Sequence, residues 1–121
     1  MYLNKVTLIG YLTGDAQSRT ARDGPPYVTF EVATKESWKD ASGAWQSHSE
    51  LHRCIAWGAR LVPFTADLKK GTHVHVEGSL RSHEYDKAGS RHRVWEVRLT
   101  SVLKIGAGCI ATDANTLAAA E

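Results

Sequence analysis

The sequence has few of the features that mark secreted, metal-binding or membrane proteins. Its 121 residues include only two cysteines, Cys54 and Cys109, which lie far apart and form no CxxC pair. We therefore expect reduced thiols and no disulfide. No apolar run approaches the roughly 20 residues that a membrane helix needs, and Lys5 and Gly10 interrupt the hydrophobic residues of the N-terminus. These absences predict a soluble, cytoplasmic protein without membrane contact.

The chain also lacks a large charge excess and any catalytic motif. Its 15 lysine and arginine residues are set against 13 aspartate and glutamate residues, which leaves a formal net charge of +2. Binding to a polyanion would depend on local clusters of cations rather than on overall charge. No nucleophile elbow, phosphate loop or closely spaced quartet of Cys and His ligands is present. We predict a protein that is not an enzyme and uses no metal or other cofactor.

Alternation of apolar and polar residues dominates the rest of the sequence and is typical of half-buried strands. The segments with this pattern are residues 4–12, 27–34, 48–57, 72–84 and 91–103. Between the third and fourth of them, residues 59–70 have helical spacing. Five strands with one helix between strands 3 and 4 predict an all-β OB-fold barrel, a fold that binds oligonucleotides. We assign residues 1–105 to this domain and residues 106–121 to a short flexible tail.

Aromatic rings occur beside basic residues on the predicted strands. Trp38 lies between Lys35 and Lys39, and Trp57 follows Arg53 on the third strand. Cations attract phosphates at any sequence, while flat rings stack on bases that have no complementary strand. A duplex offers no such exposed base faces. This pattern predicts sequence-tolerant binding of single-stranded nucleic acid.

Several of these aromatic residues also have a purely structural interpretation. Trp57 could belong to the core, and Tyr85 could be a strand-edge aromatic at a hairpin stem. We assign Trp95 to packing because it shares an apolar strand face with Val97, and Trp45 to packing within a hairpin.

Seven short segments follow one another in a specific order. They are Asn4-Lys5-Val6, Leu8-Ile9-Gly10, Ala33-Thr34-Lys35-Glu36-Ser37-Trp38, Glu50-Leu51-His52-Arg53, Trp57-Gly58, Leu68-Lys69-Lys70-Gly71 and Val76-Glu77-Gly78-Ser79-Leu80-Arg81. In this order and at these spacings the sequence resembles the bacterial-type single-stranded DNA-binding protein (SSB) family. The resemblance implies an OB fold, a homotetramer built as a dimer of dimers, and wrapping of single-stranded DNA in replication, recombination and repair. It also implies association with the nucleoid.

The resemblance assigns roles to individual residues. Base stacking is expected at Trp38, Trp57 and Tyr85. Phosphate contacts are expected at Lys5, Arg19, Arg53, Lys70 and Arg81, and at Arg60, which lies one residue past a basic position of the family. Lys35 and Lys39 are also expected to contact phosphates, because they flank Trp38. Subunit contacts are expected at His52, His73 and His75.

Two departures from the family pattern leave a second function open. Leu51 stands where the family often has tryptophan, so one stacking ring is missing. The sequence ends in Leu117-Ala118-Ala119-Ala120-Glu121 instead of the acidic Pro-Phe tip through which the family recruits replication and repair partners. The alternative to single-stranded DNA binding is therefore an OB-type interaction or assembly module with weakened DNA binding.

Overall fold

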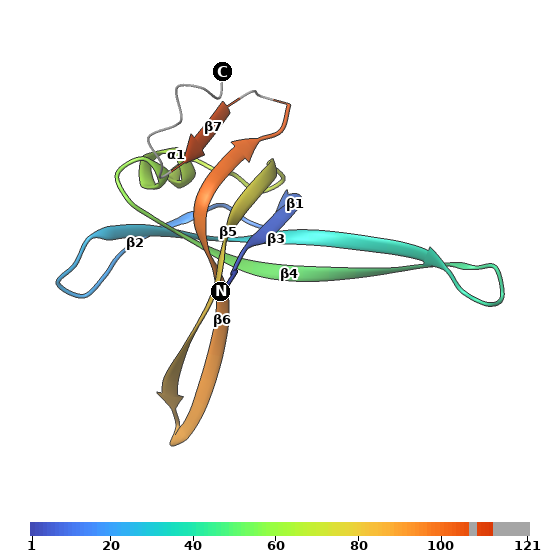
Figure 1. The fold of residues 1–121 in the computed structure, drawn as a ribbon, viewed down its shortest axis with the longest axis horizontal. Coiled ribbons are helices and arrows are strands. Elements are labelled where there is room, and N and C mark those ends of the chain that lie inside the picture. Colours follow the sequence, from blue (N-terminus) through green and yellow to red (C-terminus); the bar gives the residue numbers. More distant parts are fainter. Residues whose placement is uncertain (107–108, 113–121) are drawn as a thin grey trace.

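The computed structural model describes residues 1–106 and 109–112 of the chain. Its elements are β1 (Val6–Leu12), β2 (Gln17–Thr20), β3 (Pro26–Lys39), β4 (Trp45–Trp57), α1 (Leu61–Ala66), β5 (His73–Lys87), β6 (Ser90–Lys104) and β7 (Cys109–Thr112). Figure 1 shows two long hairpins that leave the body of the fold in different directions. We call them the β3–β4 arm (residues 35–51) and the β5–β6 arm (residues 81–95).

Five of the strands close into a barrel. Neighbouring strands pair in the order β1-β5-β6-β4-β3, and an additional pairing of β1 with β3 joins the two ends of the sheet. The pairings are antiparallel, except that β4 and β6 run parallel. In sequence, α1 lies between β4 and β5, which are the third and fourth strands of the barrel. The predicted five-stranded OB-fold barrel is confirmed.

The core consists of the inward-facing residues of these strands together with apolar residues from α1 and the turn that follows it. They are Leu12, Val28, Phe30, Val32, Cys54, Ala56, Leu61, Leu68, Val74, Val76, Val97, Leu99 and Val102. Burial of each large aliphatic side chain contributes about 1.5–3 kcal/mol, so the alternation seen in the sequence stabilises the barrel. Cys54 is a free, buried thiol, and burial raises its pKa to about 12. It therefore stays protonated at neutral pH and is a poor metal ligand.

Two glycines allow strands to approach closely where the barrel closes. A Cβ atom at Gly10 would lie 2.1 Å from the carbonyl oxygen of Ala33, at the pairing of β1 with β3. A Cβ atom at Gly78 would lie 2.1 Å from the carbonyl oxygen of Arg98, where a β-bulge shifts the register of β5 and β6. Any larger residue at either position would push two backbones apart, so these glycines are required by the barrel's curvature.

The helix is shorter than the predicted residues 59–70. It ends at Ala66, and Asp67 leaves the helical conformation. The N–H of Leu68 donates to the carbonyl of Thr65 (3.1 Å), and this turn carries Leu68 into the core. The apolar spacing therefore reflects contact with the core, and only its first part forms a helix.

Two short strands were not predicted. All four residues of β2 are exposed, so its pairing with β3 leaves no apolar alternation in the sequence. Strand β7 pairs with β6 and lies within residues 106–121, which the sequence assigned to a flexible tail. Residues 107–108 and 113–121 lie outside the described residues. No helix in the described part of the chain is long and apolar enough to cross a lipid bilayer.

Candidate nucleic-acid interface

The β3–β4 arm ends in a tip that is ordered around one carboxylate. Asp40 accepts hydrogen bonds from the Ser42 hydroxyl (2.6 Å), from the Gln46 side-chain amide (2.9 Å) and from the backbone N–H groups of Ser42 and Ala44. These donors stabilise the charged form and lower the pKa of Asp40 to about 2. These hydrogen bonds order the tip itself, from Asp40 to Gln46.

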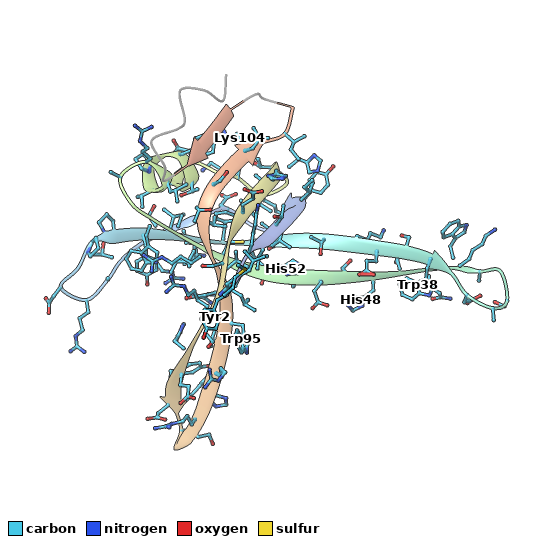
Figure 2. The ribbon with its side chains drawn as sticks, viewed as in Figure 1. Tyr2, Trp38, His48, His52, Trp95 and Lys104 are labelled. Atoms are coloured by element: carbon cyan, nitrogen blue, oxygen red, sulfur yellow. The ribbon has the colours of Figure 1, made fainter. Side chains whose placement is uncertain are left out.

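Two exposed tryptophans flank this tip. Trp38 is 46% exposed on β3, as a stacking residue requires. The assignment of Trp45 to packing is wrong, because Trp45 is exposed on β4. It lies opposite Lys39, whose Nζ is 5.6 Å from the centroid of the Trp45 ring. The cation that the sequence suggested for Trp38 therefore lies over Trp45. Figure 2 shows Trp38 far from the barrel, near the end of the β3–β4 arm.

Trp57 lies at the barrel surface and is half-buried. Its ring stacks on Tyr27 of β3, with centroids 4.5 Å apart and an interplanar angle of 29°. Tyr27 in turn lies opposite Arg19 of β2. Trp57 is not among the buried core residues, and Tyr27 covers part of its ring. The arrangement is a stacked aromatic pair with a cation on the neighbouring strand.

Arg19 and Arg53 line one polar hollow of about 290 Å³ between β2, β3 and β4. The Arg19 guanidinium donates to the Thr29 hydroxyl (3.3 Å) and to the Gln17 side chain (2.6 Å), which fixes its position. Glu31 also lines this hollow. Asp15 lines it as well, so the two arginines are matched by two carboxylates. The hollow therefore offers guanidinium groups that can bind phosphates, without a local excess of positive charge.

Arg53 also lines a second hollow, of about 150 Å³, at the place where the two arms diverge. Strands β4 and β6 pair at only two positions, Cys54 with Val97 and Ile55 with Arg98, before they separate. We call the resulting hollow the notch, lined by Leu51, His52, Arg53, Leu80, Trp95, Glu96 and Val97. Since one arginine lines both hollows, they form adjacent parts of one surface.

The notch contains a nearly buried carboxylate beside basic groups. The side chain of Glu96 is only 11% exposed, and its oxygens lie 3.4 Å from Arg53 Nε and 3.6 Å from His83 Nδ1. Arg81 lies opposite Glu96 in the β5–β6 register. The two arginines beside this carboxylate outnumber it, so the local charge favours an anionic partner although the net charge of the chain is small.

The assignment of Trp95 to packing is wrong. Trp95 and Val97 point to the same side of β6, but Val97 lies within the barrel whereas Trp95 is 55% exposed at the start of the β5–β6 arm. Leu51 and Leu80, beside it in the notch, are also exposed. The sequence does contain a signal for this exposure, since Arg93 and Trp95 place a basic and an aromatic side chain next to each other on the same strand face.

Tyr85 lies on the β5–β6 arm, where it is exposed and stacks on His92 with centroids 5.4 Å apart. The nearby Glu84 binds Arg93 (2.6 Å) and Arg91 (3.3 Å). Tyr85 therefore remains available on the arm surface, while the neighbouring arginines are held by a carboxylate. Its role in stacking stays a prediction.

The remaining predicted phosphate contacts lie at different distances from this surface. Lys70 follows α1, and its backbone N–H donates to Asp15, which lines the first hollow. Arg60 is the exposed residue before α1. Lys35 is exposed on the β3–β4 arm. Lys5 lies 3.8 Å from Glu77, on the β1–β5 face, and is not brought together with the arms.

The predicted subunit contacts lie on β4 and β5 and are linked by Thr34, which bonds to His52 and lines a hollow with Ile9, Tyr11 and His73. His73 stacks on Tyr11 with centroids 4.3 Å apart, and His75 lies opposite Ile9 on the same outer face of β1 and β5. Ile9 and Tyr11 are each 54% exposed there. His52 bonds to Thr34 (2.9 Å) and also borders the notch. Among the described residues, no three Cys, His, Asp or Glu side chains gather closely enough to hold a metal ion.

Comparison with known proteins identifies the family to which this fold belongs. Residues 3–105 match the model of the single-strand binding protein family. The chain is 39% identical over 107 residues to Single-stranded DNA-binding protein 1 of Chlorobaculum tepidum, covering 87% of this chain and 66% of that protein. It is 38% identical over 106 residues to Single-stranded DNA-binding protein 1 of Xylella fastidiosa, covering 86% of this chain and 78% of that protein.

Solved structures agree with this similarity. A Plasmodium falciparum SSB in complex with ssDNA superimposes with a TM-score of 0.74 at 28% identity, over 82% of this chain and 88% of that one. A deletion mutant of the single-stranded DNA binding protein from Thermus aquaticus gives the same TM-score and identity, over 89% of this chain and 53% of that one. The chain thus spans just under two thirds of the Chlorobaculum protein and about half of the Thermus one. Because the family model covers most of its length, the chain belongs to the single-strand binding protein family.

Proposed function

We propose that this protein binds single-stranded DNA with little sequence preference and protects it during replication, recombination and repair. The observation that carries the proposal is the position of Arg53, which lines both hollows and so joins the Arg19 side of the barrel to the notch between the arms. A single strand could follow this surface with its phosphates on cations and its bases on exposed rings. The function is binding without catalysis.

Within this proposal, the base-stacking rings are Trp38, Trp57 and Tyr85. They are supported by the exposure of Trp38 and Tyr85 and by the accessible part of the Trp57 ring, which Tyr27 leaves uncovered. The phosphate contacts nearest the two hollows are Arg19, Arg53, Lys70 and Arg81, and Lys35 and Lys39 would act further out, on the β3–β4 arm. Arg60 and Lys5 would act only at the margin of this path. Residues 1–105 should suffice for binding.

We also propose a homotetramer, a dimer of dimers. The support is the outer face of β1 and β5, where Ile9 and Tyr11 remain exposed beside His73 and His75. Exposed apolar side chains on a paired face are typical of contacts between copies of a chain. Light scattering of the DNA-free protein tests this, and a mass of one chain would contradict it.

Titration of tryptophan fluorescence with oligo-dT tests the DNA-binding proposal. We expect quenching that saturates, an affinity that falls with rising salt, and much weaker binding to a duplex of the same length. Equal affinity for duplex and single strand would contradict the proposal. A folded tetramer that binds neither would support the assembly module instead.

A further inference from the structure

The family resemblance assigns no role to Trp95, yet Trp95 is an exposed ring in the notch. Figure 2 places it at the start of the β5–β6 arm, close to the junction of the two arms. We propose that Trp95 is a further base-stacking residue and that the notch receives one unpaired base of the bound strand. This inference rests on the proposed function and adds a subsite to it.

The ring is held in place by its own strand and the neighbouring one. The Arg93 guanidinium lies 5.9 Å from the centroid of the Trp95 ring, and Arg93 is itself fixed by Glu84 (2.6 Å) and the Ser82 hydroxyl (2.9 Å). Ser82 is also the residue opposite Trp95 in the β5–β6 register, and it is too small to cover the indole. The result is a ring with a fixed cation beside it and more than half of its surface in solvent.

The surroundings of the ring match the chemistry of a nucleotide. Leu51 and Leu80 offer apolar contacts for the flat part of a base, and Val97 closes the bottom of the notch. Arg53 also lines the notch, where Glu96 lies 3.4 Å from its Nε, and it supplies a cation for an adjacent phosphate that competes with this carboxylate. A partner that is flat and apolar on one side and anionic on the other fits this combination.

A second copy of the chain is the other candidate occupant, and the charge of the notch disfavours it. Contacts between copies would bring the basic groups near Arg53, Arg81 and Arg93 against identical cations or against a separate acidic surface. The exposed apolar residues Ile9 and Tyr11, which suit such a contact, lie on the β1–β5 face instead. The notch is therefore assigned to the DNA strand.

Two substitutions at this position separate stacking from simple apolar packing. Trp95→Phe keeps a ring, whereas Trp95→Leu keeps an apolar side chain of similar reach without a ring. We expect oligo-dT to bind Trp95→Leu roughly 5- to 150-fold more weakly than the parent, which corresponds to one lost base stack. Trp95→Phe should recover most of this loss. Because the side chain is exposed, both variants should melt at the temperature of the parent.

A strand that carries abasic units in place of thymidines provides the matched control. It keeps the phosphates, so parent and Trp95→Leu should bind it with equal affinity. If the parent binds oligo-dT and Trp95→Leu binds it equally well, the inference fails while the proposed function stands. If Trp95→Leu weakens binding of the abasic strand as much as binding of oligo-dT, stacking at the notch is also refuted. The same holds if Trp95→Leu lowers the mass of the DNA-free assembly. A parent that does not bind oligo-dT refutes the proposed function itself.

Discussion

Arg53 lines both hollows, so its replacement should remove a phosphate contact from the middle of the proposed path. On single strands each neutralised phosphate contributes about 0.7 to the slope of log affinity against log salt. Arg53→Gln should therefore flatten that slope by about 0.7, and over a roughly fourfold rise in salt the parent should lose about 2.6-fold more affinity than the variant. Fluorescence titrations with oligo-dT across a salt series measure this slope.

Replacing the carboxylate beside Arg53 should have the opposite effect on DNA affinity. Glu96 lies 3.4 Å from Arg53 Nε and is largely buried, so it competes with a phosphate for the same guanidinium. Glu96→Gln should tighten binding at low salt, because it releases Arg53 and removes a negative charge from the notch. When Arg53 is also replaced, the part of this effect that comes from releasing Arg53 should be lost, and only the smaller part that comes from removing the negative charge should remain.

Arg91 provides the control for a simple loss of positive charge. It is exposed on the β5–β6 arm, within 3.3 Å of Glu84 and 3.8 Å of Asp86, and lines neither hollow. Arg91→Gln should change the salt slope by much less than Arg53→Gln. Equal slopes for the parent and Arg53→Gln, or equal changes in the two variants, would refute the assignment of Arg53 to the centre of the path.

Three further predictions concern the rings, the barrel and the arm tip. Trp38→Ala should weaken oligo-dT binding by about 1–3 kcal/mol without lowering the melting temperature. Trp57→Ala should lower both the affinity and the melting temperature, because the substitution also removes the stack of Trp57 on Tyr27 at the barrel surface. An unchanged melting temperature of Trp57→Ala would contradict this. Gly10→Ala should sharply lower the melting temperature measured by circular dichroism, since the new Cβ meets a carbonyl oxygen at 2.1 Å; a parent-like value would show that β1 can shift. The pKa of Asp40, lowered from 3.8 to about 2, means that its hydrogen bonds are fully present above 3.8 and are lost as pH falls through about 2. Hydrogen exchange at neutral pH should be faster at the tip of Asp40→Ala than in the parent, with the barrel unchanged; equal exchange at the tip would remove Asp40 from its ordering.

The barrel could be predicted from sequence because its strands are buried on one face. Val28 and Val32, for example, recur with the period of two that a half-buried strand requires, and both are fully buried. The exposure of Trp38 and Tyr85 agrees with the sequence pattern, since both rings lie among polar residues on a strand, while their role in base stacking stays a prediction. An alternating pattern of apolar residues indicates contact with a core, so it gives no information about strands that have no core contact.

The missed features lie where strands run beyond the core. The β3–β4 arm begins at residue 35, and from there both faces are exposed, so no apolar period marks its length. Trp95 keeps the strand parity of Val97, but parity cannot tell where β6 leaves the barrel. The notch depends on the divergence of β4 and β6, two strands far apart in sequence, and local patterns contain no information about that angle.

The two arms have a thermodynamic consequence for binding. Residues 35–39 and 45–51 are exposed throughout, so the β3–β4 arm has no apolar interior of its own. A two-stranded hairpin of this kind is only marginally stable in water and samples many conformations. A strand of DNA lying against it would restrict these motions, and the lost conformational entropy would offset part of the favourable contact enthalpy. The heat released on binding should therefore exceed the free energy gained, and shortening the arm should reduce the heat more than the affinity.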